Sequence, residues 1–283
     1  MDPPPFKQDL FSILNPILDA SHTRNLRFSP PNSKCLPGTR EKVIGMILSW
    51  VHAAIDEGLP HIMWIYGYAG CGKSAISHAV AERLAEEGRL AASFFFFRGA
   101  GDRSSITRFA HTIAHQLATA FPAAAPFIQD AIKADPGLAS MSTSSSAVQF
   151  RNLVLRPIAA LAGSLSLGPL IIILDGVDEC DDKEEVAELI DVATSFFAKN
   201  PRIPVRFVIA SRVENHLHRE LHSSSQVQLL NPVNQTSDED IEAVVDASIA
   251  KEKKGRLLVW TIPGQAGTTR TSSSNTSASR SSS

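Results

Sequence analysis

The chain has 283 residues, of which 43% are hydrophobic and 20% charged, and its formal net charge at pH 7 is −2. This composition is typical of a globular protein of one or two domains, and the small net charge favours neither nucleic acid nor an anionic membrane as a partner. No apolar run is long enough to span a bilayer, and the proline-rich start does not resemble a signal peptide. The three cysteines form neither a disulfide framework nor a metal-ligand spacing. We therefore expect a reduced, cytoplasmic protein.

The first 60 residues predict two helices joined by a linker. Apolar residues recur at helical spacing over residues 6–18, where Pro16 interrupts the pattern. Residues 21–38 are rich in Ser, Pro and Asn and read as a linker. A second helix is predicted from Thr39 to just before Gly58, because its apolar positions form one face.

A strand, a glycine-rich turn and a helix follow in that order. Residues 61–66 are an apolar run of strand length, and a helical pattern covers residues 73–87, with Gly88 as its stop. The turn between them matches G-x-x-x-x-G-K-[ST], the phosphate-binding loop (P-loop). Its residues are Gly67, Tyr68, Ala69, Gly70, Cys71, Gly72, Lys73 and Ser74.

This loop predicts a nucleotide site by a physical argument. Glycines allow a tight turn whose N–H groups point at phosphate oxygens, and the helix that follows adds the positive end of its dipole. We expect Lys73 to reach the β- and γ-phosphates and the hydroxyl of Ser74 to bind Mg²⁺. The alternative is a glycine turn that carries a lysine by chance, and the flanking strand and helix disfavour it.

The middle of the chain predicts one more strand and several helices. Residues 90–97 form an apolar run without alternation, which indicates a strand buried on both faces of a parallel sheet. Ser104 or Ser105 is expected to cap the next helix, which carries His111 and His115. The pattern H-E-x-x-H of metalloproteases is absent there, so we interpret both histidines as packing or surface residues. Helices are also predicted over 122–134 and 148–165, the latter kinked at Pro157.

A second diagnostic stretch begins at residue 170. Five consecutive aliphatic residues place Asp175 at the end of a buried strand, as in a Walker B motif whose carboxylate holds Mg²⁺ directly or through water. Asp178 and Glu179 follow within one turn, and one of them is expected to orient or deprotonate the attacking water. The alternative is a solvated acidic cap, with Asp182 opening the helix over 183–199.

The remaining sequence predicts two strands, a helix and a tail. Residues 204–210 form a fourth strand with Arg212 at its carboxyl end, where a cation can sense the γ-phosphate; a surface arginine is the equal alternative. Residues 226–230 are a fifth strand near the sheet edge, and 237–250 are helical. Residues 264–283 are almost entirely small and polar and are expected to be disordered.

With these motifs in order, the chain resembles the NACHT domains of the STAND class of P-loop NTPases, as found in fungal NLR-like proteins. A small residue after the Walker B aspartate (Gly176), the pair Asp178–Glu179 and the segment Cys35–Arg40 carry the resemblance, which covers about 35–250. It implies an α/β three-layer sandwich with a five-stranded parallel sheet in the order 2-3-4-1-5. It also implies ATP or GTP with Mg²⁺ as ligands and Arg212 as the sensor-1 residue.

From the resemblance we expect a nucleotide-controlled signalling switch with slow NTP hydrolysis, which associates with itself or with other NACHT and STAND proteins. A non-hydrolysing nucleotide-binding adaptor or decoy is the alternative, and a small-molecule kinase is disfavoured because no acceptor site or lid is recognisable. The expected division is an N-terminal helix and linker (1–34), a nucleotide-binding domain (35–250) and a short remnant with the tail (251–283). The chain is expected to be truncated before the winged-helix and repeat regions usual in such proteins.

Overall fold

The computed structural model describes residues 5–24, 34–161, 168–236, 238–240, 242–243 and 245–246. The chain divides into two units, Met1–Ile241 and Glu242–Ser283, and the described residues of the second unit are helical. The predicted tail, part of the predicted linker and most of the helix predicted over 237–250 lie outside the described residues.

The first unit is built on a five-stranded sheet. The strands are β1 (Ile62–Tyr66), β2 (Leu90–Phe95), β3 (Leu170–Asp175), β4 (Val205–Ser211) and β5 (Val227–Leu230). All neighbours pair in parallel, and the order is β2-β3-β4-β1-β5. The predicted fold class and strand order are therefore confirmed. In this order β4 lies between the strands that end in the P-loop and in Asp175.

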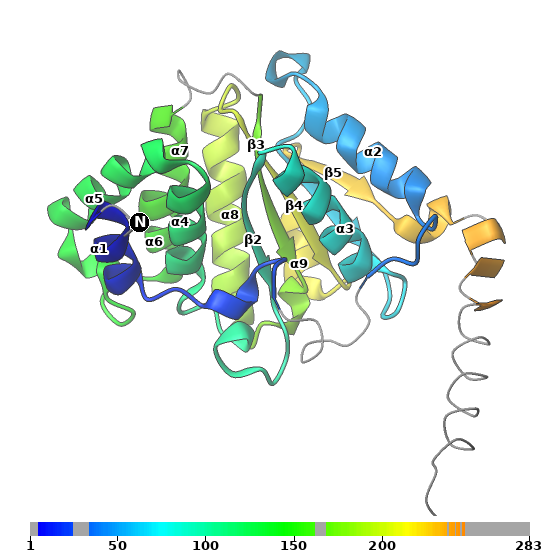
Figure 1. Ribbon diagram of the computed structural model, residues 1–283, viewed down its shortest axis with the longest axis horizontal. Helices are drawn as coiled ribbons and strands as arrows, with labels where there is room; N and C mark the ends of the chain where they lie inside the picture. Colours follow the sequence, from blue (N-terminus) through cyan, green and yellow to red (C-terminus); the bar gives the residue numbers. More distant parts are fainter. Residues whose placement is uncertain are drawn as a thin grey trace, which may run out of the picture. The chain divides into compact units, whose positions relative to one another are not determined.

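Helices cover both faces of the sheet, because successive residues of each buried strand point to opposite sides. Along β3, Ile171 and Ile173 belong to one buried cluster and Ile172 and Leu174 to the other. Figure 1 shows α2 and α3 on one side of the sheet and α4, α6 and α8 on the other. The helices are α1 (Pro5–Leu14), α2 (Glu41–His52), α3 (Lys73–Glu86), α4 (Phe109–Ala120), α5 (Ala125–Ala134), α6 (Ser146–Phe150), α7 (Arg156–Leu161), α8 (Lys183–Lys199) and α9 (Asn215–Leu221). None of the helices in the described ranges has both the length and the apolar character needed to cross a membrane.

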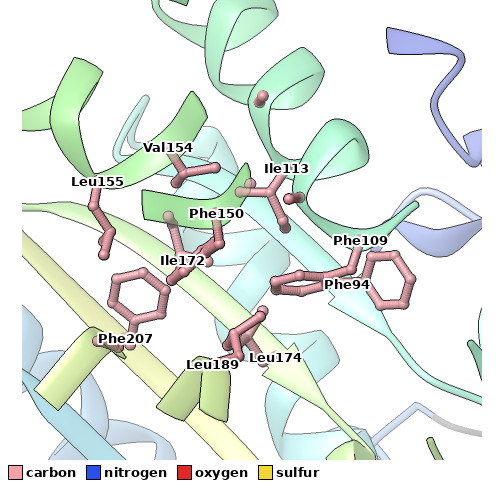
Figure 2. Packing of buried hydrophobic residues seen from close by; sticks show 14 of the residues in the cluster. Phe94, Phe109, Ile113, Phe150, Val154, Leu155, Ile172, Leu174, Leu189 and Phe207 are labelled. Atoms are coloured by element: carbon pink, nitrogen blue, oxygen red, sulfur yellow. The ribbon is translucent and has the colours of Figure 1, made fainter. Parts of the chain in front are cut away.

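The larger buried cluster is organised by a row of aromatic rings (Figure 2). Phe94 of β2 meets Phe109 of α4 at 5.2 Å between ring centroids, and Phe109 meets Phe150 of α6 at 5.6 Å. Phe150 then reaches Phe207 of β4 at 5.9 Å. Such pairs add to the stabilisation from apolar burial, so the row fixes α4 and α6 on the sheet. Leu10 and Leu14 of α1 are buried in the same cluster.

Helix α2 ends at His52, whereas the sequence predicted helix up to Gly58, so that prediction was wrong by one turn and a half. The cause lies on β4, where the fully buried guanidinium of Arg206 donates to the backbone carbonyls of Trp50, Val51 and Ala54. These bonds satisfy carbonyl groups that a longer helix would have paired with its own N–H groups. A short 3₁₀ turn, Ile55–Glu57, follows.

The predicted helix caps around residue 105 were also wrong. Helix α4 starts at Phe109, with Arg108 at the cap position and no capping side chain. Ser105 is engaged elsewhere, because the carboxylate of Asp182 accepts hydrogen bonds from the Ser105 hydroxyl and from the N–H of Ile106, both at 3.1 Å. Asp182 does stand before α8, but its carboxylate makes no capping bond to that helix. The contact between Asp182 and Ser105 has therefore replaced the caps that each residue was expected to provide to its own helix.

The predicted kink near Pro157 takes the form of a π-helical turn, Arg151–Leu155, between α6 and α7. Proline lacks the N–H that would close the next helical turn, and an inserted residue is one way to absorb that loss. His111, buried in α4, bonds through Nε2 to the carbonyl of Leu138 at 2.7 Å. It is a packing residue, as interpreted from the sequence.

Candidate functional site

A pocket of about 270 Å³ opens at the carboxyl ends of β1, β3 and β4. Parallel α/β sheets place ligands at this edge. The pocket is lined by Ala69, Gly70, Gly72, Lys73, Ser74, Ala75, Asp175, Gly176, Asp178, Glu179 and Arg212. It therefore brings together residues from three predicted motifs, of which the first is about a hundred positions before the second in the sequence. Gly67, Tyr68 and Cys71 belong to the predicted loop but do not line the pocket.

Hydrogen bonds from Lys73 to its own loop stabilise the P-loop half of the pocket. Lys73, the first residue of α3, donates from Nζ to the backbone carbonyls of Gly67 and Tyr68, each at 2.9 Å. Gly72 precedes it with φ of 93°, a left-handed conformation that glycine adopts without strain. The turn between β1 and α3 thus has the shape that directs backbone N–H groups into the pocket.

Asp175, which the sequence predicted as a Walker B aspartate, lines the same pocket as the start of α3. Asp175 is 3% exposed, and its Oδ1 has no hydrogen-bond partner among the described residues. Burial raises the pKa of Asp175 to about 6, although the hydroxyls of Ser74 and Ser77 and the charge of Arg24 favour the ionised form. A buried, unpartnered carboxylate oxygen near the Ser74 hydroxyl suits a hard divalent cation, which prefers oxygen ligands. The donor set therefore fits Mg²⁺.

The two acidic residues after β3 differ in their environments. Asp178 is buried, and its Oδ1 accepts the backbone N–H of Arg212 at 2.9 Å while its Oδ2 lies 3.4 Å from Arg212 Nε. Glu179 keeps 27% of its side chain exposed, and its Oε1 lies 4.0 Å from Arg212 Nη2. Asp178 thus ties the end of β4 to the end of β3, whereas Glu179 lines the pocket with a side chain that is more exposed.

Neighbouring groups fix this loop in place. Gly176 has φ of 69°, and a Cβ there would approach the carbonyl of Phe96 to 3.1 Å, so only glycine suits the position. Arg98, in the loop after β2, donates its N–H to Glu179 Oε2 at 3.1 Å and its Nη2 to the Asp178 carbonyl at 3.0 Å. The acidic pair is therefore supported by two neighbouring strands.

One charged residue near the pocket was missed by the sequence analysis. Arg24 is 6% exposed and its charge interacts with that of Asp175. It lies in a segment interpreted as a linker, 151 positions before its partner, and a single arginine among Ser, Pro and Asn residues gives no local signal. Only the folded chain could reveal this contact.

A comparison with known protein families assigns the chain to one of them. A family model described as nephrocystin 3, N-terminal matches residues 45–212, more than half of the chain. The chain belongs to the nephrocystin 3 N-terminal family. The matched residues of this family run from α2 to Arg212, so they include the P-loop, Asp175 and the acidic pair, while Arg24 lies outside them.

The chain is also similar to a solved structure, that of PCH-2 from C. elegans, with a TM-score of 0.39 and 12% sequence identity. That match covers 80% of this chain and 51% of the solved one, so the chain spans about half the length of PCH-2. No curated protein shows significant sequence similarity to the chain. The fold and the loop together make this a P-loop NTPase-type domain.

Proposed function

We propose that the chain is a NACHT-type, Mg²⁺-dependent nucleotide switch that binds ATP in preference to GTP and hydrolyses it slowly. One observation carries the proposal: Lys73, Ser74, Asp175, Glu179 and Arg212, which sequence motifs single out separately, line one pocket. Groups suited to binding phosphate, metal and water thus meet in one place, which supports nucleotide binding and hydrolysis at this pocket.

The loop would bind the phosphates. The ammonium group of Lys73 donates hydrogen bonds to two carbonyls of its own loop. When nucleotide binds, it would donate instead to oxygens of the β- and γ-phosphates. The backbone N–H groups at the start of α3 and the positive end of the helix dipole favour the same anion. Binding thus needs little movement of the backbone.

Ser74 and Asp175 would hold Mg²⁺. When bound, the metal supplies positive charge that stabilises the transferring phosphoryl group. The pKa of Asp175, about 6, leaves its carboxylate ionised at neutral pH. The burial that raises this pKa also favours the cation, because a poorly solvated carboxylate gains more from a counter-charge than an exposed one.

Glu179 would position the attacking water, and Arg212 would sense the γ-phosphate. Both carboxylates accept a backbone N–H, but Asp178 is the weaker candidate for the water because its side chain is only 3% exposed against 27% for Glu179. Through its contacts with the N–H and Nε of Arg212, Asp178 would set the position of that arginine, whose side chain is 48% exposed and lines the pocket. The two carboxylates thus receive different roles.

The proposed output of the switch is self-association, or contact with other NACHT and STAND proteins. The resemblance of the motif order to NACHT domains supports this part of the proposal, as does the position of β4 between the two Walker strands. In such a switch, binding and slow turnover control which partners the domain contacts.

Binding and turnover measured side by side test the proposal. Calorimetry with ATP, with and without Mg²⁺, should show metal-dependent affinity, and phosphate release at saturating ATP should be slow but above background. The Asp175→Asn variant should lose the metal dependence, while Asp181→Asn, an exposed neighbour, should keep it. Binding without any turnover would replace the switch with a nucleotide-binding adaptor. No binding at all would refute the proposal.

A further inference from the structure

The segment that leads from α1 to Arg24, residues 15–24, is docked on the domain by specific polar contacts. We call it the N-terminal strap, and Figure 1 shows its dark blue trace running from α1 past β2. At its start, the N–H of Ile17 donates to the hydroxyl of Thr112 on α4 at 3.0 Å, and this bond is buried. The side chain of Ile17 is itself part of the large buried cluster. The strap is therefore a packed element.

His22 anchors the far end of the strap to two further elements. Its backbone N–H donates to the hydroxyl of Ser93 on β2 at 2.9 Å, and its ring Nδ1 lies 3.0 Å from the same oxygen. Its carbonyl is bonded to Nε2 of His78 at 3.0 Å. His78 lies on α3, the helix that begins at Lys73, so the strap is attached directly to the P-loop helix.

These anchors deliver Arg24 to the end of the sheet beside Asp175. The guanidinium of Arg24 lies over the ring of Phe95, 3.8 Å from the centroid. Phe95 of β2 is the register partner of Asp175 on β3, and register partners in a parallel sheet point to the same face. Arg24 and Asp175 are therefore neighbours on the α3 face.

Two buried polar atoms at this point have no hydrogen-bond partner among the described residues. They are Arg24 Nε and Asp175 Oδ1. Unpaired buried polar atoms are rare in folded proteins and suggest a missing ligand. Burial lowers the pKa of Arg24 to about 10; the charge of Asp175 opposes this shift and that of Arg103 adds to it. The Asp175 charge therefore favours the guanidinium, together with the carbonyl of Ser21 at 3.4 Å and the ring of Phe95.

We propose that Arg24 serves as the counter-charge of Asp175 when the metal site is empty, so that the docked strap and bound Mg²⁺ compete for one carboxylate. The inference rests on the proposed nucleotide and metal site. Arg24 does not line the pocket; it lies over Phe95 of β2, which is on the opposite side of β3 from β1 and its loop. Mg²⁺ held by Ser74 and Asp175 would place a divalent charge next to a buried guanidinium that has lost its partner. Loading of the site would then loosen the strap.

Because binding couplings are reciprocal, the strap must weaken metal binding by the same factor by which the metal weakens strap docking. The proposed regulation is therefore that release of the N-terminal strap accompanies loading with Mg²⁺ and nucleotide. Nucleotide without metal adds no cation beside Arg24, so it should leave the strap docked.

The amide hydrogen-exchange rates of Ile17 and His22 measure how often the strap undocks, because both N–H groups donate to side chains of the domain. Wild-type protein is compared alone, with a non-hydrolysable ATP analogue in EDTA, and with the analogue plus Mg²⁺. Exchange should accelerate about tenfold only in the last condition, near the lower end of typical couplings between sites. Unchanged or slower exchange with Mg²⁺ and the analogue would overturn the inference.

Affinity measurements on Arg24 variants provide the reciprocal test. Arg24→Met keeps an apolar stem over Phe95 and removes the charge, so Mg²⁺-dependent affinity for the analogue should rise about tenfold, whereas Arg24→Lys should stay near wild type. Arg83→Met is the matched control, because Arg83 lies on α3 and pairs with Glu41 at the surface. A fall in affinity, or no change, on Arg24→Met in a protein with a native thermal transition would contradict the competition.

The two proposals fail in different ways. If the wild type binds Mg²⁺ and the analogue but Arg24→Met shows no gain, the nucleotide site stands and the competition does not. If the wild type binds no nucleotide in any condition, both proposals fall. If Arg24→Met does not fold, the exchange measurement on wild-type protein decides the inference alone.

Discussion

The two halves of the pocket are built in different ways. The P-loop half comes from eight consecutive residues, and Lys73 holds it together through carbonyls five and six positions earlier. The carboxylate half is assembled from the ends of β3 and β4, whose contacts join Asp178 to Arg212 across 34 positions. A local turn keeps its shape through its own bonds, whereas the carboxylate half depends on the sheet order. The first half should therefore govern binding, and the second should govern chemistry and stability.

The largest expected effect concerns chemistry in the carboxylate half. Glu179→Gln should slow hydrolysis about 10²- to 10⁴-fold, the range for a positioned general base, with nearly unchanged ATP affinity. Single-turnover phosphate release and calorimetry measure the two quantities. Asp178→Asn is the control, and we expect a smaller effect on turnover because its carboxylate holds Arg212. If neither substitution slows turnover, the acidic pair has only a structural role.

The second effect concerns stability and separates the two carboxylates. Asp178→Ala leaves the N–H of Arg212 without its buried acceptor, which should lower the free energy of unfolding by about 1–3 kcal/mol. Asp181→Ala, at an exposed position three residues later, should stay within about 0.5 kcal/mol of wild type. Urea denaturation compares them. Equal losses in both variants would mean that the cross-strand bond contributes nothing.

The smallest effect is a pH dependence of metal binding. Burial raises the pKa of Asp175 to about 6, and Mg²⁺ binds the ionised carboxylate. Lowering the pH from 7.5 to 5.5 should therefore weaken Mg²⁺-dependent ATP affinity by about fourfold through this group. The ATP affinity of the wild type in EDTA, measured over the same pH range, reports the titration of the nucleotide without the metal and serves as the reference. An identical pH profile with and without Mg²⁺ would exclude Asp175 as a metal ligand.

The same pKa sets the sign of a stability effect. The shift from 3.8 to about 6 favours the protonated form in the folded state, and at 1.36 kcal/mol per pKa unit it corresponds to on the order of 3 kcal/mol. The folded state is stabilised by this group at pH values below about 4, and that contribution is lost as the pH rises through 6. Burying Asp175 thus costs stability at neutral pH, as expected at a site that needs a cation.

The sequence predicted the features that rest on contiguous patterns. The five strands follow from apolar runs, and the P-loop follows from a motif flanked by a strand and a helix. The strand order came from the family resemblance, because no local pattern specifies which strands are neighbours. Once β3 and β4 are adjacent, the placement of Asp175 and Arg212 at one pocket follows from the parallel sheet.

The features that the sequence analysis missed depend on contacts between distant residues. Arg206 of β4 ends α2 through a bond to Val51, 155 positions earlier, and the carboxylate of Asp182 binds the Ser105 hydroxyl that was expected to cap a helix. Both involve polar side chains with several available partners, so local propensity could not choose among them. Arg24, near Asp175 at the candidate site, was missed for the same reason: its position depends on residues far away in the sequence.

One measurement tests the central claim most directly: the affinity of the full chain for ATP with Mg²⁺, compared between wild type and Lys73→Ala by calorimetry. Lys133→Ala is the matched control, because Lys133 is exposed on α5, outside the pocket lining, and forms an ion pair with Asp130. We predict that Lys73→Ala abolishes measurable affinity, that Lys133→Ala binds like wild type, and that all three proteins share one thermal transition. Affinity of Lys73→Ala within a factor of about three of wild type would show that this loop is not the phosphate site.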